Sequence, residues 1–315
     1  MAKTAKTGTK KRRRRSQAPV ALIYFTTLLI FLGVFGLFAK MIVNKLSTKH
    51  GADANISDTY IDSYNTLYAR VNAKDALADL FVLRICPEQA RVIVVPISSY
   101  TVSTVDEGKN FREVYAEGGI RQLQTAVDNT FGISTNYYAT VTNSSFEDIC
   151  DIVGGITYAP EEELYYLDKN GDNDISLRPN KAVALSGKQI RLILQSPVFS
   201  SGKQGNMEFL GVALTELINN AFDQVEMTSA SLDNIYSKIG SNSATNLSEN
   251  EYKEHRAYIK AMLEKQIRPA ETLTPSGTWS DEKHFTPSNE FKQQLYDVME
   301  ATKSQAKSGA KTEDQ

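Results

Sequence analysis

The alternation of apolar and polar residues predicts strands and helices in turn along most of the chain. Leu80–Cys86 and Arg91–Pro96 are continuous apolar runs bounded by turn-forming residues, a pattern typical of strands that are covered on both faces. Shorter or alternating patterns predict further strands at Tyr64–Val71, Tyr137–Val141 and Ile156–Tyr158. These strands therefore lie in the first half of the chain, with longer intervals after Pro96 and after Val141.

Apolar residues at helical spacing predict that helices fill those intervals. Ser144–Glu147 and Ser248–Glu251 have the capping-box pattern, in which each side chain accepts a hydrogen bond from the other residue's backbone N–H group. Gly118 and Gly119 precede one helical stretch, and Gly154 and Gly155 follow another. The predicted helices are 120–130, a short one from Ser144, 186–194, 207–222, 248–264 and 288–301. Strands separated by helices indicate a layered α/β/α domain.

The N-terminal region consists of a basic run followed by an apolar run. Eight Lys or Arg and no acidic residue precede residue 18, and the 22 residues from Ala18 to Ala39 carry no charge. About 20 apolar residues suffice to cross a membrane as a helix, and flanking positive charge stays in the cytoplasm. A cleaved signal peptide is the alternative, but its apolar run is shorter, about 7–15 residues. We therefore expect a single-pass protein of the cell membrane with its main domain outside the cytoplasm. Its expected parts are a cytoplasmic tail at 1–17, a signal-anchor transmembrane helix at 18–40, a stem at 41–60, one extracytoplasmic domain at 61–301 and a disordered tail at 302–315.

Charge and cysteine content narrow the function classes. Beyond residue 17 the chain has 27 basic and 37 acidic residues, and such an acidic domain does not suit nucleic acid, which is bound through neutralised phosphates. Cys86 and Cys150 are the only two cysteines, and they either form one disulfide or remain two buried thiols. Three scattered histidines exclude a zinc signature and a Ser/His/Asp hydrolase pattern.

Five stretches in one order carry a family resemblance. Tyr64–Leu67 matches a first strand and Ala78–Leu80 the start of a second, and Val114–Gly119 precedes the helix. The last two stretches are Gly132–Tyr138, which continues through Phe146–Ile156, and Leu185–Gln189. Together they resemble the LytR-CpsA-Psr family of cell-envelope proteins. The resemblance implies a three-layer α/β/α domain with a mixed central sheet. It also implies a phosphotransferase that moves glycopolymers from polyprenyl-pyrophosphate carriers to the cell wall.

The positions at which that family places its chemistry depart from its pattern. An Asp after the first strand is replaced by Asn72, a Pro-Arg-Asp segment by Ile97–Ser99 and an Arg-x-Arg pair by Gln195–Pro197. The family's charged positions are therefore occupied by uncharged residues at Ser98, Ser99, Gln195 and Pro197. Glu208 stands where the family has an Arg, and Arg70 stands where it has a Gly. Removing one preorganised charge stabiliser costs about 10²–10³ in rate, so these changes predict a degenerate active site.

Asp79, Arg112 and Arg121 are the candidates for any remaining site. The resemblance implies that Asp79 binds a divalent cation, and we expect Mg²⁺ if any activity remains. The two arginines are candidate replacement cations for substrate binding, or else surface charges. Asp168–Asp174 has part of the EF-hand spacing but lacks its Gly and its bidentate Glu, so a hairpin turn between Leu164–Leu167 and Ile175–Leu177 is the better interpretation.

The resulting prediction is a catalytically degenerate LytR-CpsA-Psr-like protein that binds or scaffolds components of cell-wall glycopolymer assembly. Expected partners are the cytoplasmic membrane and a polyprenyl-linked glycan or other cell-wall assembly proteins. Two alternatives remain: an active glycopolymer ligase that uses Asp79, Arg112 and Arg121, and a surface glycan- or protein-binding module.

Overall fold

The computed structural model describes residues 63–168, 171, 174–240 and 244–309, all within one compact unit, Tyr60–Gln315. The predicted tail 1–17, transmembrane segment 18–40 and stem 41–60 lie outside the described residues. No helix among the described residues combines the length and the apolar character that a membrane crossing needs.

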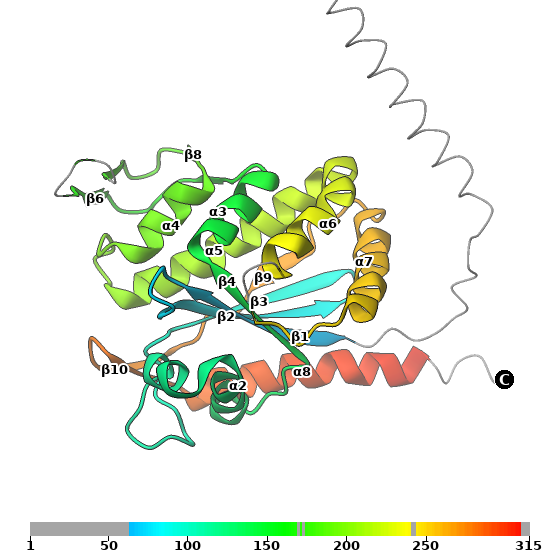
Figure 1. Cartoon of the computed structure of the whole chain (residues 1–315), viewed down its shortest axis with the longest axis horizontal. Coiled ribbons are helices and arrows are strands. Elements are labelled where there is room, and N and C mark those ends of the chain that lie inside the picture. Colours follow the sequence, from blue (N-terminus) through cyan, green and yellow to red (C-terminus); the bar gives the residue numbers. More distant parts are fainter. Residues whose placement is uncertain (1–62, 169–170, 172–173, 241–243, 310–315) are drawn as a thin grey trace, which may run out of the picture. The chain divides into compact units, whose positions relative to one another are not determined.

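A five-stranded mixed sheet lies at the centre of this unit (Figure 1). The order across the sheet is β4 (Tyr137–Thr142), β1 (Tyr64–Val71), β2 (Leu77–Cys86), β3 (Arg91–Ile97) and β9 (Ala270–Thr272). Strand β2 pairs antiparallel with both β1 and β3, whereas β4 pairs parallel with β1 and β9 pairs parallel with β3. The mixed sheet that the resemblance implied is confirmed, and β9 is a strand that the sequence did not predict.

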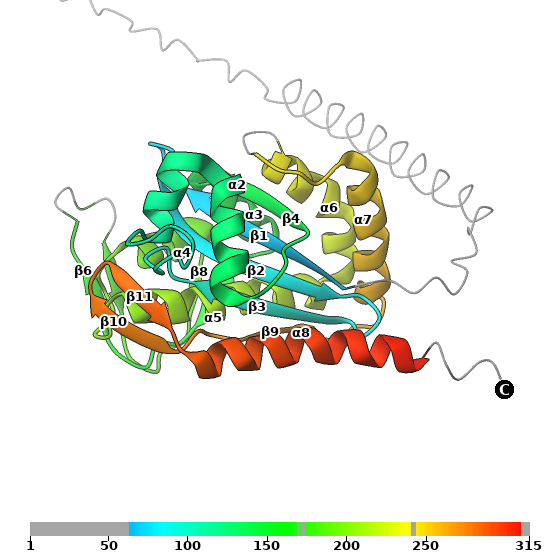
Figure 2. The ribbon, with the colours of Figure 1, turned by 90° about the horizontal axis from the view of Figure 1, so that it is seen from below.

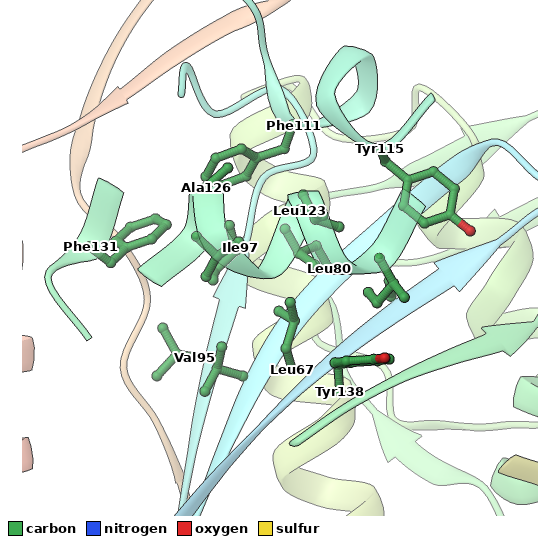
Figure 3. Close-up of a cluster of buried hydrophobic side chains, with 14 of the residues drawn as sticks. Leu67, Leu80, Val95, Ile97, Phe111, Tyr115, Leu123, Ala126, Phe131 and Tyr138 are labelled. Carbon is green, nitrogen blue, oxygen red and sulfur yellow. The ribbon is translucent and has the colours of Figure 1, made fainter. Parts of the chain in front are cut away.

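Helices cover both faces of the sheet, as the α/β/α prediction requires (Figures 1 and 2). Side chains alternate between the faces along each strand, so each of the two faces has its own hydrophobic cluster. One face packs against α2 (Phe111–Phe131) and α8 (Asn289–Gly309), and Figure 3 shows Phe111, Leu123 and Phe131 of α2 over the sheet. The other face packs against α3 (Asn143–Ile152), α4 (Gly187–Gln195), α5 (Lys203–Asp223) and α6 (Val225–Gly240), while α7 (Glu249–Leu263) contributes to a third, smaller cluster.

Three helix starts differ from the prediction, and one of them is that of α5, which begins at Lys203 instead of residue 207. The α2 helix begins at Phe111, because Asn110 and Glu113 form a capping box there, and Gly119 interrupts it with a φ of 65°. The α3 helix begins at Asn143 with Thr142 as its cap, so the predicted cap at Ser144 is wrong. The predicted helix starts at Ser186 and Ser248 are confirmed, and each of these serines caps its helix in a capping box.

Other differences lie in the second half of the chain. The sequence did not predict α6, whose Ser, Thr, Asp and Asn residues favour caps and turns over helix interiors. It also missed the hairpin of β10 (Gly277–Asp281) and β11 (His284–Pro287), most of which is exposed. The predicted hairpin is confirmed, with β6 (Leu164–Tyr166) antiparallel to β7 (Ile175–Leu177). A further short pair joins β5 (Ile156–Tyr158) to β8 (Val183–Leu185), and α8 extends eight residues past the predicted end at Ala301.

The two cysteines are free and buried. Cys150 lies in the cluster beneath α3, and burial raises the pKa of its thiol to about 12, although the nearby Arg70 charge lowers it. A thiol with so high a pKa stays protonated, so Cys150 is a small core residue and a poor nucleophile.

Candidate functional site

A cavity of about 520 Å³ lies at one edge of the central sheet. β1, β3 and β4 all have their carboxyl ends at this edge, because β2 runs antiparallel to β1 and β3 while β4 runs parallel to β1. The cavity is lined by segments that follow β1 and β3 and by the first turns of α2, α3 and α5. Open α/β sheets commonly bind ligands at the carboxyl ends of their strands.

A buried ion pair forms part of the cavity wall. Arg70 near the end of β1 lies opposite Asp79 near the start of β2, and its side chain is 1% exposed. Its Nε lies 2.6 Å from Asp79 Oδ2, and its Nη2 donates to the same oxygen. Its Nη1 donates to Asn143 Oδ1, and its guanidinium carbon lies 5.5 Å from the ring centre of Phe146. Arg70 is therefore held by three neighbours, and Asp79 is the one acidic residue among the described residues of the lining.

Three further cations line the cavity: Lys74, Arg112 and Lys203. Arg112 Nη1 donates to the hydroxyl of Tyr100 at 3.3 Å, and the guanidinium carbon lies 5.1 Å from the centre of that ring. Lys203 Nζ lies 5.6 Å from the same ring centre. Within the part of the chain that the structure describes, none of the three forms an ion pair. The cavity wall therefore carries an excess of positive charge.

Helix N-termini add to this positive field. Arg112 is the second residue of α2, Asn143 the first of α3 and Lys203 the first of α5. The N-terminus of a helix carries a partial positive charge and attracts anions. α2 and α3 have side-chain caps, whereas α5 begins after Gly202, which has no side chain to cap it.

An apolar group forms another part of the wall. Ile97 comes from β3, Leu194 from α4, and Met207 and Leu210 from α5, and each is buried. A cavity with cationic and apolar walls suits a ligand that has an anionic group next to an apolar one.

The cavity residues do not fit a magnesium ion. Mg²⁺ takes about six oxygen ligands and is usually bound by one or two carboxylates. Asp79 is paired with Arg70, and Asn72 Oδ1 accepts from the backbone N–H groups of Lys74 and Ala76. Across the described residues, no group of three or more His, Cys, Asp or Glu is arranged to hold a metal ion.

A comparison with protein-family models decides what kind of protein this is. Residues 80–303 match the model of the LytR-CpsA-Psr family. The chain belongs to that family. No curated protein sequence matches it.

Solved structures agree with this assignment at the level of the fold. A protein of Eubacterium siraeum is 16% identical with a TM-score of 0.67, over 80% of this chain and 99% of that one. TagV of B. subtilis is 18% identical with a TM-score of 0.61, over 76% and 97%. A structure described as TagT bound to LI-WTA is 13% identical with a TM-score of 0.57, over 76% and 90%. The described α/β domain is therefore a LytR-CpsA-Psr fold.

The structure brings most of the residues selected from the sequence together. Asp79 and Arg112 line the cavity, as do four of the positions that depart from the family pattern: Asn72, Ser98, Ser99 and Gln195. Arg121, Pro197 and Glu208 are not part of the lining. Arg121 is exposed and its Nε donates to the hydroxyl of Tyr138, while exposed Glu208 accepts from Gln204.

Sequence reasoning missed several of the lining side chains, among them the polar residues Lys74, Tyr100, Asn143, Lys203 and Asn206. In the sequence, Lys74 and Lys203 are single cations in polar stretches, and Asn143 is one of several polar residues in a row. Arg70 did carry a signal, since it is the one charged residue in the predicted strand Tyr64–Val71.

Proposed function

We propose that this protein binds a polyprenyl-pyrophosphate-linked glycan and serves as a binding or scaffolding component of cell-wall glycopolymer assembly, without ligase activity of its own. The observation that carries the proposal is the composition of one cavity. Among the described residues, the cavity has three cations that form no ion pair, and it also has an apolar wall. Its carboxylate, Asp79, is paired with the buried Arg70.

The cationic wall supports binding of a pyrophosphate. Arg112, Lys74 and Lys203 form no ion pair in the described part of the chain, so a bound anion would be their counter-charge. Charge-assisted hydrogen bonds from such groups to phosphate oxygens are about twice as strong as neutral ones. The N-termini of α2, α3 and α5 favour the same sign of charge.

The apolar wall supports a lipid next to that pyrophosphate. Leu194, Met207 and Leu210 are buried on the α4 and α5 side of the cavity. Each CH₂ group of a lipid that leaves water there gains about 0.8 kcal/mol. The relative described as TagT bound to LI-WTA has the same fold, which makes a lipid-linked wall polymer a reasonable ligand class.

The location follows from the N-terminal sequence. The basic run and the 22 uncharged residues from Ala18 to Ala39 support a single membrane anchor with the cavity domain outside the cytoplasm. That location gives the cavity access to lipid-linked carriers in the outer leaflet and to other cell-wall assembly proteins.

Loss of catalysis follows from what the cavity does not offer. Phosphoryl transfer depends on charge stabilisation and on an oriented nucleophile, and Asn72, Ser98, Ser99 and Gln195 bring no charge to this cavity. The alternative of an active ligase has one observation in its favour, because Asp79 and Arg112 line the same cavity. Asp79 is paired with Arg70, however, so it is a poor general base.

Two assays on the purified full chain in detergent test this function. Isothermal titration calorimetry measures binding of farnesyl diphosphate and of farnesol, and a transfer assay with Mg²⁺ measures release of polyprenyl phosphate from a lipid-linked glycan. We expect the diphosphate to bind, the alcohol to bind at least about tenfold more weakly, and no polyprenyl phosphate to be released.

Matched variants show whether the cavity is responsible. Arg112→Met should weaken diphosphate binding by about tenfold, whereas Arg121→Met, which removes an exposed arginine from the same helix, should leave it unchanged. Equal binding by both variants would refute a ligand site in this cavity. Turnover that is lost in Asp79→Asn would establish the ligase instead.

A further inference from the structure

Arg70 is a buried cation at the wall of the ligand cavity. Its contacts with Asp79 and Asn143 use three of the five N–H groups of a guanidinium. One hydrogen each on Nη1 and Nη2 is left over, and both nitrogens belong to a residue that lines the cavity. The guanidinium is positively charged, so Arg70 adds a cation to the cavity wall.

The same side chain occupies one oxygen of the carboxylate that a divalent cation would need. Nε and Nη2 of Arg70 both approach Asp79 Oδ2. A metal ion at that oxygen would lie next to a positive guanidinium in a partly buried site, where like charges repel strongly.

The neighbouring side-chain oxygens already accept hydrogen bonds. Asn143 Oδ1 accepts from Arg70, and Asn72 Oδ1 accepts from two backbone N–H groups. Ser98 Oγ accepts from the backbone N–H of Tyr100, and Gln195 Oε1 accepts from Arg191. A metal ion at any of these oxygens would therefore lie close to a hydrogen-bond donor that is already directed at the same oxygen.

We propose that the guanidinium of Arg70 takes the place of a divalent cation beside Asp79, so that the cavity binds a pyrophosphate without a metal. This inference rests on the proposed function for its ligand class. It makes Arg70 a positioning residue and a fixed counter-charge for the anion. In this arrangement the negative charge of Asp79 repels the bound anion, so Asp79 weakens binding. A carboxylate that held a bridging metal ion would instead strengthen binding.

The first experiment uses wild-type full chain and compares farnesyl diphosphate binding in excess EDTA with binding in millimolar Mg²⁺. We expect the affinity in Mg²⁺ to be no higher than in EDTA. A parallel titration follows Mn²⁺ alone by electron paramagnetic resonance, and we expect the free Mn²⁺ signal to be unaffected by the protein.

The second experiment measures whether the substitution Asp79→Asn strengthens or weakens diphosphate binding. Asp79→Asn keeps an acceptor oxygen for Arg70 and removes the negative charge, so diphosphate binding in EDTA should become tighter, by about threefold to tenfold. Arg70→Lys keeps the charge but not the planar fork, and it should weaken binding. Circular dichroism confirms that each variant is folded, and the wild-type comparison stands even if a variant fails to fold.

The outcomes separate the two proposals. Diphosphate binding could appear only with Mg²⁺ or Mn²⁺ and be lost in Asp79→Asn. That result would overturn the proposal that Arg70 takes the place of a metal ion, and it would leave the proposed function standing. Absence of diphosphate binding under both conditions would overturn both. Equal binding with and without metal, with Asp79→Asn at least as tight as wild type, would support both.

Discussion

Arg70 and Asp79 face each other across the antiparallel strands β1 and β2, and two nitrogens of the buried guanidinium donate to one carboxylate oxygen. Removing one partner of a buried ion pair leaves an uncompensated charge. Asp79→Ala should therefore lower the free energy of unfolding by about 3–5 kcal/mol, as measured by urea denaturation.

An exposed pair provides the control for this prediction. Arg91 and Glu271 join β3 to β9, and their side chains are 39% and 51% exposed. Glu271→Ala should change the free energy of unfolding by less than about 1 kcal/mol, because solvent screens exposed pairs. Equal losses in Asp79→Ala and Glu271→Ala would show that Arg70 does not depend on Asp79.

Gly155 ends the segment between α3 and β5 and is required there for two reasons. Its φ is +68°, and a Cβ at this position would lie 2.2 Å from the carbonyl oxygen of Leu185. Gly155→Ala should thus add a clash of about 1–3 kcal/mol to a left-handed strain of about 1–2 kcal/mol.

Gly132→Ala is the matched control, because Gly132 has the same φ but a Cβ added there would have no atom within 4 Å. Thermal unfolding should show a clearly larger loss for Gly155→Ala than for Gly132→Ala, and equal losses would contradict the close approach to Leu185.

His255 makes stability depend on pH. Its ring stacks on Tyr64 at 3.9 Å between ring centres, and burial lowers the pKa of His255 below its ordinary value although Glu251 and Glu254 raise it. The unfolded chain then binds the proton more readily, so the free energy of unfolding falls as pH drops below about 6.5, by at most about 1.4 kcal/mol per pH unit. His255→Phe keeps the aromatic stack and should reduce this slope between about pH 5 and pH 7 in urea unfolding. An unchanged slope would show that His255 is not its source.

The buried thiols predict slow chemical labelling. Cys86 and Cys150 are each 1% exposed and free. In the native protein neither should react with a maleimide at the rate of an exposed cysteine, whereas after denaturation without reductant both should react. Fewer than two reactive thiols in the denatured protein would indicate that the two form a disulfide.

The strongest hydrophobic patterns were enough to predict the central strands. Continuous apolar runs placed β2 and β3 because strands in the middle of a covered sheet are apolar on both faces. The α6 helix was missed because its residues have weak helix propensity, and its stability comes from packing against other helices. Helix packing of this kind is not visible in one sequence.

The candidate site was predictable in part. The resemblance selected Asp79, and Arg112 was a candidate replacement cation; both line the cavity. The contact between Arg70 and Asp79 depends on strand register, which shifts between Arg70 and Val71. Arg121 does not reach the cavity although it follows Arg112 in the same helix. The non-helical Gly119 between them breaks the regular spacing, so counting residues along the helix could not place Arg121.

The most direct test of the central claim measures binding and transfer in one sample. The full chain is incubated with a radiolabelled lipid-linked glycan, Mg²⁺ and peptidoglycan, and both retained ligand and released polyprenyl phosphate are quantified. We predict saturable retention that falls by about tenfold in Arg112→Met, with no release above a protein-free control. Release by wild type that is abolished in Asp79→Asn would contradict the claim that this cavity binds its ligand without acting on it.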